Sequence, residues 1–273
     1  MIIINYKREF IGELLGTFIM VLFGCGAVAV SVLFNSHQGL FQIAIVWGIG
    51  VTLAIYATRH LSCAHLNPAV SLAMVISKRM TIKKLPTYFL AQFIGAFLAG
   101  LVLYLLFNPS IVAVENTRQI IRGSTESMEI AKMFGEYYQL PSSIAVVSMP
   151  LAMLAEGFGT FLLVLMIFFL TEGCNLGRPV DSMSPIFIGL TVTSIICLIA
   201  PLTQAGLNPA RDFSPRLVAW IFGWGDAAFP DKTGGYFLVY ILAPLLGGQA
   251  SALLFTRVLE PIMKKSNEQC NCN

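Results

Sequence analysis

The sequence predicts an all-α membrane protein with six transmembrane helices and two re-entrant half-helices, arranged as an inverted repeat. Of its 273 residues, 56% are hydrophobic and only 11% are charged, whereas soluble domains carry about 25% charged residues. Six apolar stretches have about the 20 residues that a spanning helix needs. The triplet Asn-Pro-Ala also occurs twice, at residues 67–69 and 208–210. A repeated polar motif in so apolar a chain indicates a duplicated membrane unit.

The six predicted spans cover residues 10–34, 41–59, 86–107, 146–170, 183–201 and 236–259. Two further apolar stretches, 67–77 and 208–219, are too short to cross and begin at the triplets, so we expect half-helices there. We expect a single domain over residues 1–273, made of a first repeat (1–107), a connecting loop (108–145), a second repeat (146–259) and a tail (260–273).

Basic residues in the connecting segments predict the orientation of the spans. If the N-terminus lies inside, eleven Lys and Arg residues fall on the inner side and six on the outer side. Each repeat has three predicted spans, an odd number, so the second repeat must be inverted relative to the first. We therefore expect a multi-pass protein of the cell (inner or plasma) membrane. Its N- and C-termini would be cytoplasmic and the loop over residues 108–145 extracellular.

Each triplet has the composition of a helix start. Proline suits the first helical position because its missing N–H would be unpaired there, and Asn67 or Asn208 before it is a good N-cap. Irregular backbone at membrane depth survives only against protein or a water-filled cavity. We therefore expect two positive half-helix ends to meet at the midplane of a pore. Carbonyl acceptors along the pore would come from the stretches before the triplets: Cys63, Ala64, His65, Gln204, Ala205 and Gly206.

A second repeated phrase contains a carboxylate in each half, Glu13 and Glu156, which precede the triplets by 54 and 52 residues. Carboxylates inside a membrane are costly and usually functional. They could relay protons, as in a transporter, or accept backbone N–H bonds from the stretch before each triplet. Their symmetric placement favours the structural role. His65 could hold a pore acceptor or simply pack, and Arg211 could pair with Asp212 or face the pore as a cation.

The motifs around the triplets, His65-Leu66-Asn67-Pro68-Ala69-Val70 and Leu207-Asn208-Pro209-Ala210-Arg211-Asp212-Phe213, resemble those of the major intrinsic protein family, the aquaporins and glycerol facilitators. Asp212 after Arg211, the phrase over residues 121–127 and the long connecting loop are similar to the bacterial glycerol facilitators. The resemblance implies an aquaporin-like right-handed bundle, a homotetramer, and one pore in each protomer.

The resemblance also implies a selectivity filter at Trp47, Ile196, Ala205 and Arg211, with Asp212 as structural support. The bacterial facilitators have phenylalanine where Ala205 stands and glycine where Ile196 stands. The filter of this chain is therefore more similar to that of nodulin-type plant channels, which the resemblance associates with glycerol and other small uncharged solutes.

The predicted function is passive diffusion of glycerol, small polyols and water across the lipid bilayer, with ions and protons excluded. The alternative is a water-selective pore, or one for urea or metalloid hydroxides. An ion-coupled secondary transporter would need a titratable relay, and only Glu13 and Glu156 are available. The chain has three histidines and no nucleophile–base set, so we expect no enzyme, no cofactor and no metal site. A net charge of only +3 argues against nucleic acid as a partner.

Overall fold

The computed structural model describes residues 6–37, 39–230 and 234–270, with side chains described as far as Lys265. Six helical runs in it are long and apolar enough to span a membrane. Five are α1 (Lys7–Phe34), α2 (Leu40–Thr58), α4 (Leu85–Arg118), α6 (Met149–Thr171) and α7 (Ser184–Thr203). The sixth runs continuously through α9 (Gly235–Phe237), α10 (Ala243–Leu254) and α11 (Glu260–Cys270), which are joined by π-helical turns. The prediction of an all-α membrane protein with six spans is confirmed.

Two short helices begin at the repeated triplets, α3 (Pro68–Ile76) and α8 (Pro209–Ala219). Neither is long enough to cross a bilayer. Each has proline at its first position and an asparagine N-cap with an extended backbone, as the triplets predict. They lie inside the bundle rather than on its surface, since α3 packs against α10 and α8 packs against α4.

The packing of the helices follows the duplication. In the first half, α1 packs against α2 and α4, and in the second half α6 packs against α7 and α10. The contact of α8 with α4 has its counterpart in that of α3 with α10, and α2 and α7 join the halves. Close approach needs glycine at equivalent places: a side chain at Gly95 would meet the Leu14 carbonyl, and one at Gly247 the Gly157 carbonyl.

Helix α4 is longer than the sequence predicts. It ends at Arg118 rather than at residue 107, so the predicted loop over residues 108–145 begins with about three turns of helix. Pro109 lies inside this helix, where a proline removes one backbone hydrogen bond. The helix continues because Ile111 is fully buried in a cluster that includes the connecting loop, and the Glu115 carboxylate pairs with Arg122.

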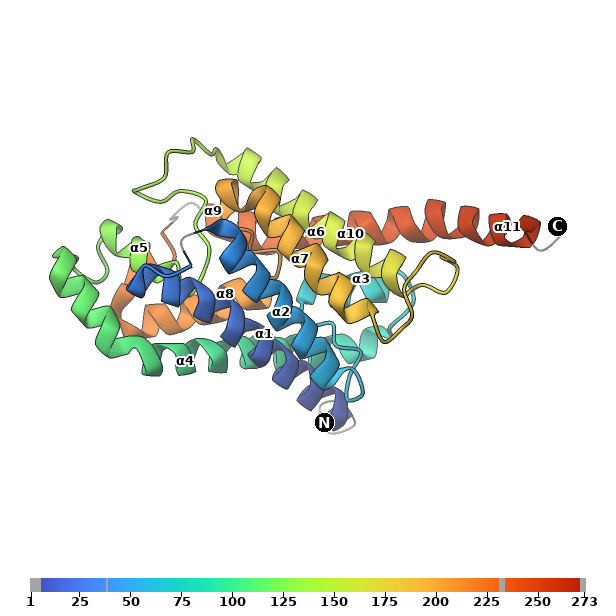
Figure 1. The fold of residues 1–273 in the computed structure, drawn as a ribbon, viewed down its shortest axis with the longest axis horizontal. Helices are drawn as coiled ribbons and strands as arrows, with labels where there is room; N and C mark the ends of the chain where they lie inside the picture. Colours follow the sequence, from blue (N-terminus) through green and yellow to red (C-terminus); the bar gives the residue numbers. More distant parts are fainter. Residues whose placement is uncertain (1–5, 38, 231–233, 271–273) are drawn as a thin grey trace.

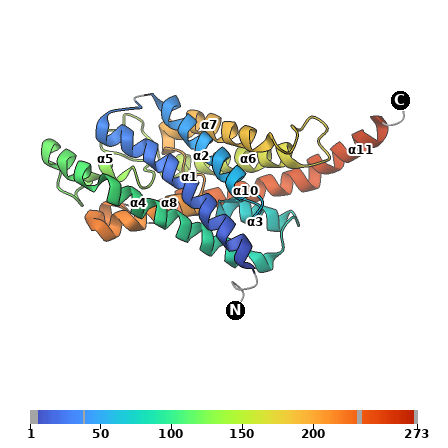
Figure 2. The ribbon, with the colours of Figure 1, turned by 60° about the horizontal axis from the view of Figure 1, so that its bottom comes forward.

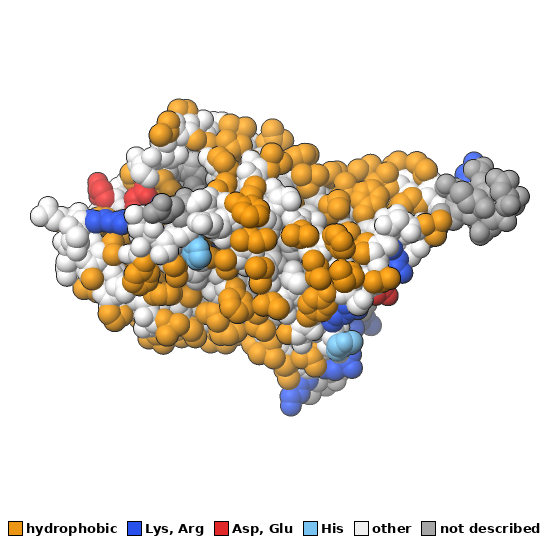
Figure 3. Space-filling view, in the orientation of Figure 1, with side chains coloured by type: hydrophobic (Ala, Val, Ile, Leu, Met, Phe, Trp, Pro, Cys, Tyr) orange, Lys and Arg blue, Asp and Glu red, His pale blue; other side chains and the backbone are white. Residues whose placement is uncertain are grey.

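The rest of the connecting loop and the tail contain helix as well. The short helix α5 (Met128–Ala131) lies in the loop, and the predicted tail is helical to Cys270. Both termini lie at the end of the bundle opposite α5 (Figures 1 and 2). Between the two ends the visible surface is mainly hydrophobic, and charged side chains gather toward the ends (Figure 3). Such a surface fits a bilayer as its solvent.

Candidate functional site

The two half-helices meet tip to tip, and each asparagine completes the other's tip. The Asn67 side-chain amide donates to the Leu207 carbonyl at 3.0 Å, and the Asn208 amide donates to the Leu66 carbonyl at 2.8 Å. Each side-chain oxygen caps its own helix by accepting backbone N–H bonds, the Asn67 oxygen from Ala69 at 2.8 Å. A primary amide has two hydrogens, so each asparagine keeps one N–H beyond the bond to leucine. Both asparagines line the central cavity, where a passing oxygen can accept it.

The backbone before each tip is held in an unusual conformation. Ala64 and Leu66 have φ angles of 49° and 54°, and Ala205 and Leu207 have φ angles of 66° and 55°. Residues other than glycine rarely occupy this left-handed region, and each costs of order 1 kcal/mol or more. The same stretch in each half therefore carries the same strain, which turns successive peptide groups in different directions and requires support from the surroundings.

The repeated glutamates supply that support. The two oxygens of Glu13 accept from the backbone N–H groups of His65 and Leu66, at 2.9 and 2.8 Å. The two oxygens of Glu156 accept from those of Gly206 and Leu207, at 2.9 and 2.7 Å. Both carboxylates are fully buried and lie behind the cavity wall. The hydrogen bonds are those that the structural reading of the repeated phrase expects.

The glycines of the repeated phrase also fit this arrangement. A side chain at Gly16 would meet the Leu66 side chain, and one at Gly159 would meet that of Leu207. The leucine before each asparagine therefore packs directly against α1 or α6. Two side chains that complete the Glu13 site were not predicted: Ser62 donates to Glu13 at 2.8 Å and Gln92 donates to it at 2.8 Å.

The cavity has a volume of about 480 Å³ and runs past both tips. All four predicted filter residues line it, although they come from different elements: Trp47 from α2, Ile196 from α7, Ala205 from the strained stretch and Arg211 from α8. The Arg211 guanidinium carbon lies 4.4 Å from the centroid of the Trp47 ring. An aromatic face and a cation thus stand side by side on the wall.

The Arg211 side chain is 4% exposed, and its two terminal nitrogens differ. One (Nη2) donates to the Glu136 carboxylate, whereas the other (Nη1) has no hydrogen-bond partner. Asp212, the partner that its position next to Arg211 suggests, is 3.9 Å from Nη1 and is not hydrogen-bonded to it. A buried donor without an acceptor is costly, and this one belongs to a side chain that lines the cavity.

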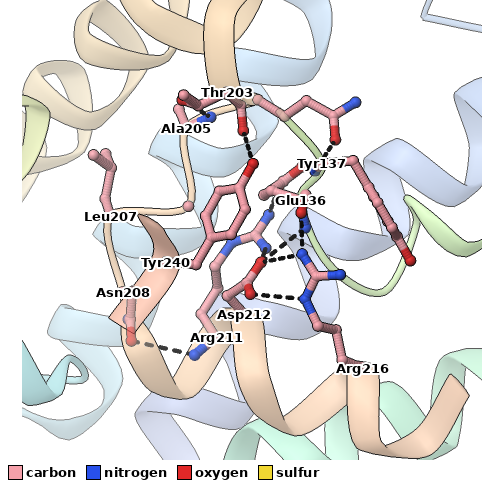
Figure 4. Close-up of polar contacts among 12 residues, drawn as sticks. Glu136, Tyr137, Thr203, Ala205, Leu207, Asn208, Arg211, Asp212, Arg216 and Tyr240 are labelled. Carbon is pink, nitrogen blue, oxygen red and sulfur yellow. Dashed lines mark hydrogen bonds and ion pairs between the residues drawn. The ribbon is translucent and has the colours of Figure 1, made fainter. Parts of the chain in front are cut away.

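Behind the filter, Asp212 and Arg216 form a second ion pair, one turn apart on α8 (Figure 4). Asp212 accepts from Arg216 Nε at 2.8 Å and from the backbone N–H of Glu136 at 2.7 Å. Arg216 also donates to the Glu136 carbonyl, and three tyrosine rings surround it. The pair therefore fixes the backbone at Glu136, and with it the carboxylate that holds Arg211.

Glu136 is the main site residue that the sequence did not reveal. It lies in the connecting loop, 75 residues from Arg211, in no motif and in no repeat. Burial raises the pKa of its carboxyl to about 7, against the opposing effect of the Arg211 charge. The next residue is held too, since the Tyr137 N–H donates to the Gln204 side chain at 2.8 Å.

The predicted carbonyl stretches lie largely along the cavity. Cys63, Ala64 and His65 line it on one side of the tips, and Ala205 and Gly206 on the other. The His65 ring lies 3.2 Å from the Ser71 hydroxyl and is tilted against the Tyr88 ring, with ring centroids 5.0 Å apart. Gln204 does not line the cavity. The wall is thus polar along the two strained stretches and apolar where α2 and α7 face them.

Comparison with known proteins places this arrangement in a wider group. Residues 2–255 match the family described as Major intrinsic protein. A glycerol uptake facilitator of Haemophilus influenzae is 38% identical over 98% of both chains. A propanediol uptake facilitator of Citrobacter freundii is 39% identical over 92% of this chain and 91% of its own. The aquaglyceroporin of Plasmodium falciparum superposes with a TM-score of 0.80 at 27% identity, covering 94% of this chain and 98% of its own.

Proposed function

The chain belongs to the major intrinsic protein family, and on that premise we propose that it is a passive channel for glycerol and related small uncharged solutes. The observation that carries this proposal is the unpartnered Arg211 Nη1 beside the Trp47 face, in a cavity that continues past the two asparagines. The site offers hydrogen bonds without a reacting group, so transport down a gradient is the chemistry that it supports.

A polyol fits such a cavity because it has carbon–hydrogen groups on one edge and hydroxyls on the other. The carbon edge lies against Trp47 and Ile196, and the hydroxyls accept from Arg211 and then from Asn67 and Asn208. Carbonyls of the strained stretches accept the hydroxyl hydrogens in turn. Each of these hydrogen bonds replaces a hydrogen bond between the solute and water. None is a strong ionic bond, so the solute can also leave.

Ions and protons are excluded by the charges along the same path. The N-terminal ends of α3 and α8 both point at the midplane, and each carries a partial positive charge. Arg211 adds a full positive charge at the filter. Cations and hydronium therefore meet positive potential at two places. Replacing Arg211 with alanine should reduce solute discrimination and permit proton leak. Unchanged discrimination would show that Arg211 is not part of the filter.

The permeant solutes extend beyond glycerol in this proposal. Two of the matched relatives are propanediol uptake facilitators, so small diols join glycerol, and water accompanies both. A water-selective pore is the second candidate. The narrowing effect of Ile196 favours it, whereas the small Ala205 leaves room for a carbon chain.

The protein would span the cell membrane with both termini in the cytoplasm. The excess of Lys and Arg at the end that holds the termini supports this orientation. The loop between α4 and α6 is then extracellular, and the filter faces outward. The two repeats correspond to α1–α4 and α6–α10. We also propose that the chain forms a homotetramer with one pore in each protomer.

Stopped-flow light scattering on proteoliposomes tests the proposal. Purified protein should accelerate the entry of glycerol and propanediol well above that of bare lipid, with urea and five-carbon polyols as size probes. Imposed proton and sodium gradients should leave the glycerol rate unchanged, which separates a channel from a coupled transporter. Vesicles in which only water crosses faster would favour the water-selective alternative.

A further inference from the structure

A second charged cluster lies on the cavity wall, at the end of the bundle that holds both termini. Arg79 follows half-helix α3 and, with Glu172 after α6, lines the same cavity as the filter. The chain reverses sharply before it, with Lys78 at a φ of 60° and the Arg79 N–H bonded to the Met74 carbonyl at 2.8 Å. The turn fixes the backbone of Arg79, so the position of its guanidinium depends on what holds the side chain.

Three elements hold that guanidinium. It donates to the Glu172 carboxylate, to Glu260 Oε2 at the start of α11 at 3.0 Å, and to the Ser77 carbonyl at 3.1 Å. It also lies 4.9 Å from the ring centroid of Phe168 and 5.7 Å from that of Phe255. Although partial burial opposes it, hydrogen bonding to the two carboxylates raises the pKa of Arg79, so the side chain stays charged.

Glu260 differs from the other members of the cluster because it does not line the cavity. Its second oxygen accepts from Lys264 Nζ at 2.6 Å, which keeps the carboxylate turned toward Arg79. The Arg79 and Glu260 side chains are 21% and 17% exposed, so the pair is only partly screened by water. Among the residues that line the cavity, Arg79 is the one that Glu260 pairs with.

We propose that Glu260 is a positioning residue for conduction: it holds the Arg79 guanidinium against the cavity wall and thereby keeps the inner mouth open. Without Glu260, a charged side chain on the wall lacks one acceptor, and the cavity offers others: water, the carboxylate of Asp181 and the stretch over residues 63–65. Arg79 then turns inward, narrows the mouth and binds passing hydroxyls. The first turn of α11 is thereby coupled to the pore, a step that rests on the proposed channel function.

The test compares Glu260→Gln with Glu9→Gln in proteoliposomes. Glu9 is a matched control, since it pairs with Lys84 at 3.0 Å, is 22% exposed and does not line the cavity. We expect Glu260→Gln to lower glycerol permeability by about threefold to tenfold. The loss of one partly buried ion pair shifts Arg79 from its position on the wall toward the inward position. Water permeability should fall less than glycerol permeability because the mouth narrows and does not close. Glu9→Gln should have the permeability of the wild type.

The decisive variant adds Arg79→Ala to Glu260→Gln. Removing the side chain that obstructs the mouth should restore glycerol permeability to near the wild-type value, and Glu260→Asp should retain most of it. A double variant that stays as slow as Glu260→Gln would overturn the proposal, because the glutamate would then act through the fold alone. An unchanged rate in Glu260→Gln would also overturn it. Failure of the wild type to conduct glycerol would instead refute the proposed function.

Discussion

Arg211 and Glu136 form a buried ion pair that joins the half-helix α8 to the loop between α5 and α6, and only the arginine of the two lines the cavity. Glu136 occupies one terminal nitrogen of the guanidinium, and the other has no hydrogen-bond partner. In the proposed channel, the loop would thus affect how strongly Arg211 binds a solute hydroxyl.

Glu136→Gln should slow glycerol and increase its apparent affinity. The neutral amide is a weaker acceptor for Arg211 Nη2, so the guanidinium binds solute hydroxyls with both nitrogens. A gain of one charge-assisted hydrogen bond corresponds to about threefold to tenfold in residence time. Concentration dependence of glycerol flux measures both effects. Glu129→Gln, in the same loop but outside the cavity, serves as control; equal flux in all three proteins would show that Glu136 does not restrain Arg211.

Glycerol permeability should depend on pH near neutrality. The pKa of Glu136 is raised to about 7 by burial, so its carboxylate is ionised and fully paired with Arg211 above that value. As the pH falls through 7, protonation weakens the pair, and the wild type should approach the behaviour of Glu136→Gln. Flux measured from pH 8 to pH 6, with equal pH on both sides, checks this. The variant itself should show a flat profile over that range.

Glu13→Gln and Glu156→Gln should destabilise the protein by similar amounts. Each glutamate accepts two neighbouring backbone N–H groups with its two oxygens, and an amide would set a donor against one of them. The loss is about 2–3 kcal/mol for each, visible as a lower unfolding temperature in detergent. Glu9→Gln, at a partly exposed glutamate, again provides the comparison. Full stability of both variants would revive the proton-relay reading if the wild-type flux also responded to a proton gradient and the variants lost that response.

Ile196→Ala should widen the filter. Ile196 lines the cavity, whereas its neighbour Ile195 is equally buried but does not. Removal of the Ile196 side chain should raise the ratio of five-carbon polyol to glycerol permeability by about tenfold, the discrimination that small changes in a pocket produce. Ile195→Ala removes the same atoms away from the cavity and should leave the ratio unchanged. A similar increase in both would assign the effect to loosened packing.

Sequence reasoning reached the parts of the site that are repeated. The two triplets predict where α3 and α8 begin. Glu13 and Glu156 stand out because each half has one intramembrane glutamate at an equivalent position. It did not reach Glu136, because a contact across 75 residues from an irregular loop leaves no periodic signal. The left-handed backbone at Ala64 and Ala205 was equally hidden, since alanine has no preference for it.

The length of α4 shows a different limit. Local preference correctly marks Asn108-Pro109 as a weak point in a helix, but burial of Ile111 and the pairing of Glu115 with Arg122 outweigh it. Glu115 and Arg122 are seven residues apart, a spacing that the helical pairing rules do not cover. The cluster that buries Ile111 includes residues of α1 and of segments far along the chain.

The crossed bonds between Asn67 and the Leu207 carbonyl, and between Asn208 and the Leu66 carbonyl, have a consequence for ancestry. Each asparagine side chain needs a carbonyl of the other half as its acceptor. A protein made of one half alone could therefore form this pore only as a dimer of identical subunits inserted in opposite directions. Fusion of two such copies would remove the need for dual insertion. Each copy could then acquire residues of its own, as long as the crossed bonds were kept.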